Sequence, residues 1–174
     1  MKIFSKTNAL LLSFLAGWLL YSCSISYSFK NKSIIDYDKV SSISIKDFPN
    51  LSSYVYAPLA QQFTEALRDK FTRQTKLRVV REGGDLDLEG EISGCNFTSM
   101  AVTDGAYASQ TRLTVSIRVR YTNNTDPDDF LEQTFSAYQE FSNASTIDQV
   151  QDELFKLIIE EIVDAIFNET VAKW

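Results

Sequence analysis

The chain has 174 residues, of which 17 are basic and 23 are acidic, and it contains no histidine. The formal charge of −6 argues against nucleic acid as a partner and against adhesion to anionic membranes by charge alone. The missing histidine removes Ser–His–Asp and Cys–His pairs, histidine general bases and histidine metal ligands. We therefore expect a protein that is not an enzyme and that uses no cofactor and no metal.

The chain begins with a short apolar segment that ends at a cysteine. Lys2 and Lys6 precede the apolar stretch Ala9–Leu20, whose 12 residues fall short of the roughly 20 that a membrane-spanning helix needs. A basic start before about 7–15 apolar residues is typical of a secretory signal. "LLYSC" resembles the bacterial lipobox, in which an apolar residue and then a small one precede an obligatory cysteine. This resemblance implies cleavage before Cys23 and lipidation of Cys23. The alternative is an uncleaved signal anchor with an incidental cysteine.

Cleavage at this point leaves 152 residues, Cys23–Trp174, enough for one domain with a hydrophobic core. Both lysines of the signal are lost, so 15 basic and 23 acidic residues remain, a formal charge of −8. Cys95 is then the one further cysteine, so the core and not a disulfide must hold the fold. We expect a signal peptide over 1–22, a lipidated tether over 23–38 and a folded domain over 39–174.

A strand and a helix open the predicted domain. In "VSSISIKDF", Ile43 and Ile45 share one face of a strand, with serines and a lysine on the other face. Pro58 is placed well at the first position of a helix, which we expect over about 58–73. Its apolar stripe is formed by Leu59, Phe63, Ala66, Leu67 and Phe71.

Alternating stretches predict the strands that follow. "KLRVVRE" and "LDLEGEISG" are separated by a glycine pair, and "TRLTVSIRVRY" gives the clearest alternation of the chain. "NNTDPDD" supplies a turn, and "FLEQTFSAYQEF" returns from it. One apolar and one polar face are typical of a half-buried antiparallel strand.

The last predicted element is a long helix, for which Ser145 and Asp148 resemble a capping box. About 24 residues would span roughly 36 Å. Its apolar stripe is formed by Val150, Leu154, Leu157, Ile158, Glu161, Ile162, Ala165 and Ile166. So broad a stripe must be buried under a sheet or against a partner. The order of elements predicts an α+β two-layer sandwich, with two helices packed on one mainly antiparallel sheet of four to five strands.

Acidic residues occupy alternate positions of one predicted strand, at Asp85, Asp87, Glu89 and Glu91. As catalytic carboxylates they would need different environments that separate their pKa values. The alternative, which we favour, is a solvated outer face.

Arginines share the polar face of "TRLTVSIRVRY", at Arg112, Arg118 and Arg120. A guanidinium binds phosphate in bidentate fashion, so this row is a candidate site for a phosphorylated glycolipid. Ordinary ion pairing with the neighbouring acidic strand is the alternative.

Residues 95–110, "CNFTSMAVTDGAYASQ", are too many for a tight hairpin. They include Phe97, Met100, Val102 and Tyr107, which is too apolar for a freely solvated loop. An exposed apolar loop suits insertion into a partner. Alternatively, the two strands run on and these side chains pack within the domain.

Taken together, these elements behind a lipobox resemble the LptE family of lipopolysaccharide-assembly lipoproteins, in its Bacteroidetes branch. The stretches that carry the resemblance are "CSISYSF", "RLTVSIRVRYTNNTDPDDFLEQTFSAYQEF" and "EEIVDAIFNETVAKW". The resemblance covers essentially the whole chain after the signal.

The resemblance implies a lipid-anchored protein of the Gram-negative outer membrane, on its periplasmic side. There it would plug the lumen of the β-barrel LptD, support the assembly of that barrel and help lipopolysaccharide reach the outer leaflet, without catalysing a reaction. The three arginines are then candidate lipopolysaccharide contacts, and the apolar segment is a candidate barrel contact. The alternative is a stand-alone lipid-binding or lipid-carrying lipoprotein, which would need an apolar cavity between its sheet and helices.

Overall fold

The computed structural model describes residues 35–100 and 109–172. The signal peptide, most of the tether, Val102 and Tyr107 lie outside these ranges. The elements are β1 (Ser42–Ile45), α2 (Leu59–Gln74), β2 (Arg78–Val80), β3 (Leu86–Met100), β4 (Gln110–Asn123), β5 (Phe130–Ser142) and α3 (Ile147–Thr170). No helix in these ranges is long and apolar enough to span a bilayer.

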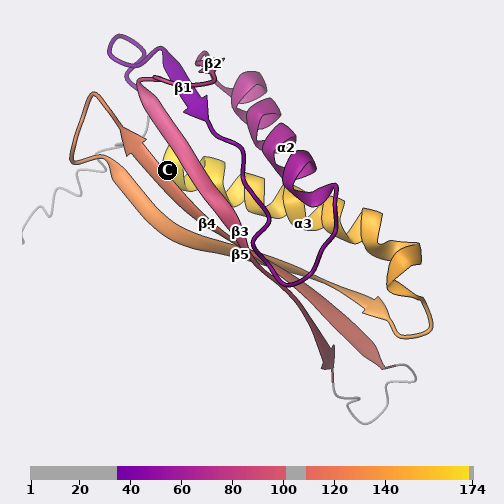
Figure 1. Ribbon diagram of the computed structural model, residues 1–174. Coiled ribbons are helices and arrows are strands. Elements are labelled where there is room, and N and C mark those ends of the chain that lie inside the picture. Colours follow the sequence, from indigo (N-terminus) through magenta and orange to yellow (C-terminus); the bar gives the residue numbers. More distant parts are fainter. Residues whose placement is uncertain (1–34, 101–108, 173–174) are drawn as a thin grey trace, which may run out of the picture. The chain divides into compact units, whose positions relative to one another are not determined.

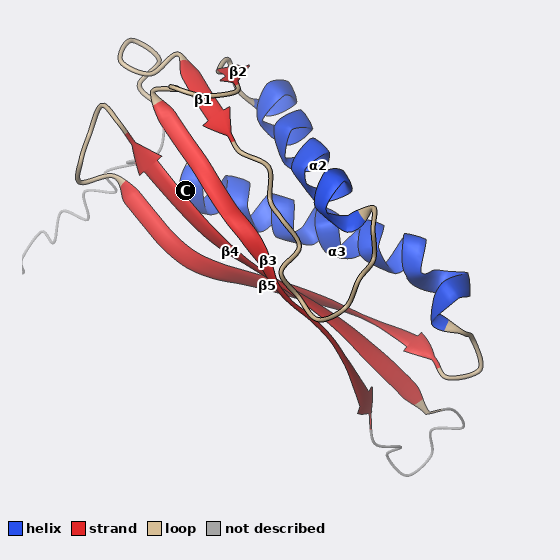
Figure 2. Cartoon of the chain, viewed as in Figure 1, coloured by secondary structure: helices blue, strands red, loops and turns tan. Residues whose placement is uncertain are grey.

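The strands form one open sheet in the order β2-β1-β3-β4-β5 (Figure 1). β1 is parallel to β2, which it reaches by a crossover through α2, and it is also parallel to β3. β3, β4 and β5 are antiparallel. Figure 2 shows both helices on the same side of the sheet, with α3 packed under β5 and β4 and α2 packed against α3 and β2. The predicted fold class is confirmed, with five strands in a mixed sheet.

The inner face of the sheet and the apolar faces of both helices form a continuous core. The inward residues of β4 are all buried, as the alternation predicts: Leu113, Val115, Ile117, Val119 and Tyr121. Gly90 of β3 leaves room for Phe48, because a Cβ there would lie 2.6 Å from the Phe48 ring and would also overlap the Arg118 carbonyl oxygen. Phe48 in turn packs edge-on against Phe63 of α2, with the ring centroids 5.1 Å apart.

The serines of β1 are buried, although they lie on the face opposite Ile43 and Ile45. The Asp85 Oδ2 atom accepts hydrogen bonds from the backbone N–H groups of Ser41 (2.8 Å) and Ser42 (3.0 Å) and from both of their hydroxyls. The Ser44 hydroxyl donates to Asp87, and the Ser44 residue is only 1% exposed. Both faces of β1 are therefore enclosed, and its outer face is held by carboxylates.

The cap of α3 lies one residue later than predicted. The Thr146 N–H donates to Gln149 Oε1 at 3.1 Å, so the capping box uses these two residues in place of Ser145 and Asp148. Gln149 is one of the residue types that usually close such a box. Asp148 lies instead in the first turn, where a carboxylate is favourable near the positive end of the helix dipole.

The structure separates two leucines that the predicted stripe of α3 grouped together. Leu154 is 7% exposed and Leu157 is 41% exposed. We expect Leu154→Ala to lower the free energy of unfolding by about 2–5 kcal/mol, because it leaves a cavity. Leu157→Ala should cost less than about 1 kcal/mol. Urea denaturation of both variants measures the difference, and equal losses would contradict this placement of the helix.

Asp85 should make the stability of the fold depend on pH. Hydrogen bonds from Ser41 and Ser42 hold the pKa of the Asp85 carboxyl below its ordinary 3.8. The charged carboxylate therefore stabilises the folded state above the unfolded pKa, and this contribution is lost as the pH falls through the folded pKa. We expect Asp85→Asn to melt at a lower temperature than the wild type at pH 7, with the gap closing below about pH 4. Asp38→Asn, at an exposed residue, is the control and should melt like the wild type at both pH values.

Candidate functional site: the outer face of the sheet

Charged side chains gather on the outer face of the sheet, away from the helices. In the antiparallel register of β3 and β4, Glu89 lies opposite Arg120 and Glu91 lies opposite Arg118. Side chains directly opposite one another on the same face have Cβ atoms about 4.5–5.5 Å apart. Each of these arginines is therefore placed against a glutamate.

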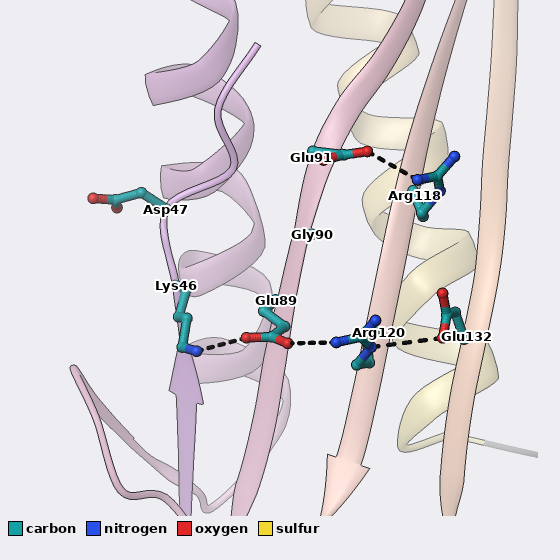
Figure 3. Close-up of a pocket in the computed structure, with 8 residues that line it drawn as sticks. All are labelled: Lys46, Asp47, Glu89, Gly90, Glu91, Arg118, Arg120 and Glu132. Atoms are coloured by element: carbon teal, nitrogen blue, oxygen red, sulfur yellow. Dashed lines mark hydrogen bonds and ion pairs between the residues drawn. The ribbon is translucent and has the colours of Figure 1, made fainter. Parts of the chain in front are cut away.

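Four residues form a continuous row of alternating charge across the sheet, which we call the charged row (Figure 3). Lys46 Nζ lies 2.6 Å from Glu89 Oε2, and Arg120 Nη1 lies 3.3 Å from Glu89 Oε1. Arg120 Nε lies 3.6 Å from Glu132 Oε2 on β5. The hydrogen bond from Lys46 holds the pKa of Glu89 below its ordinary value, so Glu89 stays ionised and is unsuited to act as a general acid.

Arg118 lies beside the charged row in a shallow depression of about 330 Å³. Its Nη1 atom is 3.1 Å from Glu91 Oε1. The depression is lined by Lys46, Asp47, Glu89, Gly90, Glu91, Arg118, Arg120 and Glu132. Three of these residues are basic and four are acidic, so the depression has no net positive charge to attract a phosphate.

Arg112 belongs to a different part of the same face. Its Nε and Nη2 atoms lie 3.1 Å and 2.6 Å from Glu140 Oε1, and its guanidinium carbon lies 4.1 Å from the centroid of the Tyr138 ring. It lies six positions before Arg118 along β4, a rise of roughly 20 Å. The structure thus brings Arg118 and Arg120 together but places Arg112 apart, and it pairs all three with glutamates.

The first part of the apolar stretch expected as a long loop, residues 95–100, is strand. β3 continues to Met100 and β4 starts at Gln110, so the alternative that the strands run on describes Phe97 and Met100. Phe97 packs edge-on against Tyr54, with the centroids 5.0 Å apart, although it remains 38% exposed. Contact of these side chains with a barrel stays a prediction.

A register shift in β3 between Ile92 and Gly94 explains why the strand was predicted only as far as Gly94. Ile92 pairs with Ile117, but after the shift Cys95 pairs with Val115. Alternation therefore changes phase at this bulge, and the inward positions move from even to odd residue numbers. A pattern of strict alternation ends there, even though the strand does not.

Asp87 and Cys95, two further groups of the described residues, have structural surroundings. Asp87 accepts hydrogen bonds from Ser44 and, at 2.7 Å, from the Asn124 amide. Burial raises the pKa of the Cys95 thiol to about 11, which leaves it protonated and unreactive at neutral pH. Within residues 35–100 and 109–172, no group of three Cys, Asp or Glu residues is arranged to hold a metal ion.

Pairing of Arg118 and Arg120 with Glu91 and Glu89 agrees with the alternative of ion pairing with the acidic strand. Sequence reasoning missed the other members of these contacts, namely Lys46, which pairs with Glu89, and the arginine partners Glu132, Glu140 and Tyr138. Each has an even residue number, like the outward positions of β1 and β5. The alternation in the sequence therefore indicates that these side chains face outward. The pairing itself depends on the register between strands, which no single stretch encodes.

Comparison with known proteins gives a family and several distant structures. The LptE family, described as lipopolysaccharide-assembly, matches residues 40–170. No curated protein matches the chain. The hypothetical protein CT253 of Chlamydia trachomatis is 13% identical with a TM-score of 0.49, covering 76% of this chain and 99% of that one. The minor lipoprotein of Acinetobacter baumannii is 11% identical with a TM-score of 0.46, covering 74% and 93%. Rare lipoprotein B of Shewanella oneidensis is 12% identical with a TM-score of 0.45, covering 74% and 89%.

The family match confirms the resemblance drawn from the sequence and does not depend on the distant structures. It includes all the strands and helices described above. Since residues 40–170 make up more than half of the 174 residues, this chain belongs to the LptE family of lipopolysaccharide-assembly lipoproteins.

Proposed function

We propose that this chain is an outer-membrane lipoprotein, anchored through Cys23, that plugs the lumen of an LptD-type β-barrel. In this role it supports assembly of the barrel and the passage of lipopolysaccharide to the outer leaflet. The observation that carries the proposal is the family match over residues 40–170. The family consists of non-enzymatic lipopolysaccharide-assembly lipoproteins of the Gram-negative envelope. The "LLYSC" stretch supplies the residue for the anchor.

The outer face of the sheet fits a polar enclosure. The interior of an outer-membrane barrel is polar, and its lipid-facing exterior is apolar. Between the two groups of arginines the outer face carries small hydroxyl side chains, and the Ser116 and Ser136 hydroxyls lie 2.8 Å apart. When such a face enters a barrel, hydrogen bonds to water can be replaced by hydrogen bonds to polar groups of the lumen wall. The ion pairs within the sheet stay intact, so no charge is left unpaired.

A stand-alone lipid carrier is the weaker alternative. An acyl chain would have to lie between the sheet and the helices, where large side chains already pack. Phe71 and Phe167 meet edge-on at 5.2 Å between the two helices, and Phe155 stacks on Tyr56 at 4.4 Å. A densely packed interior of this kind favours a plug over a protein that carries lipid in a cavity.

The anchor and the partner can be tested together with the two cysteines of the chain. We expect the wild type and Cys95→Ala to carry acyl groups and to co-purify with a large β-barrel from detergent-solubilised outer membranes. Cys23→Ala should lack acyl groups and leave the membrane fraction, since lipid attachment needs that sulfur. Intact-mass spectrometry and identification of the bound proteins provide the measurements.

Two results would count against this proposal. Acyl groups on the Cys23→Ala variant would mean that the lipid is attached to a residue other than Cys23. Lipidated wild type that is isolated without any barrel would remove support for the plug.

The arginine row remains a candidate lipopolysaccharide contact, and a charge swap separates that role from ion pairing. Arg118→Glu places a carboxylate opposite Glu91, so we expect a leakier outer membrane, measured by sensitivity to large antibiotics. Adding Glu91→Arg restores the pair with its charges exchanged, and we expect it to restore the barrier. Arg73→Glu, on the exposed face of α2, is the control. If the swap fails to rescue, the position of the arginine itself matters, as a lipopolysaccharide contact requires.

A further inference from the structure

The edge of β5 that faces away from β4 can accept another strand. β5 is the last strand of the sheet, and its register with β4 is unbroken from Phe130 to Ser142. Over the described ranges, the backbone of residues 131–141 bonds to β4 and to no other segment. Natural edge strands are usually blocked by lysine, proline, a bulge or shortness. β5 has 13 residues without lysine, proline or a bulge, and its two charged side chains, Glu132 and Glu140, lie on the outer face, whereas the opposite edge strand, β2, has only three residues.

The charges on the outer face favour a basic partner at this edge. The charged row alternates from Lys46 through Glu89 and Arg120 and stops at Glu132 on β5. A second, shorter row runs from Arg112 to Glu140, also on β5. Both rows therefore end on a carboxylate beside the open edge. A lysine or arginine on an added strand would continue each alternation, and opposite charges across strands are stabilising.

The same two glutamates disfavour a second copy of this chain as the added strand. Antiparallel pairing of two β5 strands along their full length is centred on Ser136 and places Glu132 opposite Glu140 twice. Like charges directly opposite one another are destabilising. The net charge of −6 on each copy adds to the repulsion.

The inner side of the edge would receive apolar side chains. α3 packs beneath β5, and the inward residues Leu131 and Phe141 of β5 are only half-buried against the core. In a strand paired with β5, alternate side chains point to the helix side of the sheet. Apolar side chains at those positions would bury Leu131 and Phe141 further.

We propose that the free edge of β5 binds an extended segment of a partner polypeptide. The segment carries basic residues opposite Glu132 and Glu140, eight residues apart, and apolar residues toward α3. Backbone hydrogen bonds supply affinity, and the two basic positions supply selectivity, as in other cases of strand addition. This inference goes beyond the proposed plug role and does not depend on it.

Synthetic peptides test the proposal on the purified full chain in detergent. The probe is a fluorescent peptide of alternating threonine and valine with two lysines eight residues apart, compared with the same peptide carrying two glutamates. We expect the lysine peptide to bind roughly tenfold more tightly in fluorescence anisotropy, since two cross-strand pairs change from repulsive to attractive. N-methylation of its backbone should abolish binding. The double variant Glu132→Lys/Glu140→Lys should reverse the preference.

A matched variant controls for general charge. Glu153→Lys/Glu160→Lys makes the same change on the exposed face of α3 and should keep the preference for the lysine peptide. The proposal is overturned by equal binding of both peptides, or by a reversal that occurs equally in this control. A dimer in light scattering that Glu132→Lys/Glu140→Lys disrupts would overturn it in favour of a second copy. Much tighter peptide binding after deletion of residues 24–33 would overturn it in favour of the chain's own tether.

Discussion

The helices cover one side of the sheet only, and most features of this domain follow from that constraint. A sheet buried on one face must alternate apolar and polar residues along each strand. β4 does so without exception from Leu113 to Tyr121. The bare face then has to satisfy two requirements, because it must be hydrophilic enough to face water or a polar wall, yet must not expose unpaired charges.

Cross-strand pairing meets both requirements. Arg112, Arg118 and Arg120 each lie within 3.3 Å of a glutamate oxygen on a neighbouring strand, so the outer face is polar and close to neutral. The acidic surplus of the chain lies partly elsewhere, for instance at the exposed Glu153 and Glu160 of α3. The net charge of the whole chain therefore says little about the charge of the face that would meet a barrel or a lipid.

Helices and strands with a regular apolar pattern could be predicted from the sequence. Features that depend on contacts with residues far along the chain could not. The sequence predicts α2, β4 and the body of α3 because each repeats apolar residues with the period of a helix or a strand, although Leu157 in the predicted stripe of α3 is exposed. It places the serines of β1 on the face opposite the isoleucines but does not reveal their burial, since that depends on Asp85, more than 40 residues further along the chain. The arginine row is visible in the sequence, but its glutamate partners on β5 depend on a register that only the folded sheet defines.

The bulge in β3 connects the fold to the function proposed for its outer face. If strict alternation continued past Ile92, Asn96 and Thr98 would point into the core, and Cys95 and Phe97 would point outward. The extra residue reverses this, so that Cys95 and Phe97 lie opposite Val115 and Leu113 on the helix side. One inserted residue thus gives the outer face beyond the bulge Asn96 and Thr98 in place of Cys95 and Phe97. Polar side chains at these positions suit the polar lumen of the proposed function, and the same irregularity hid the second half of β3 from sequence reasoning.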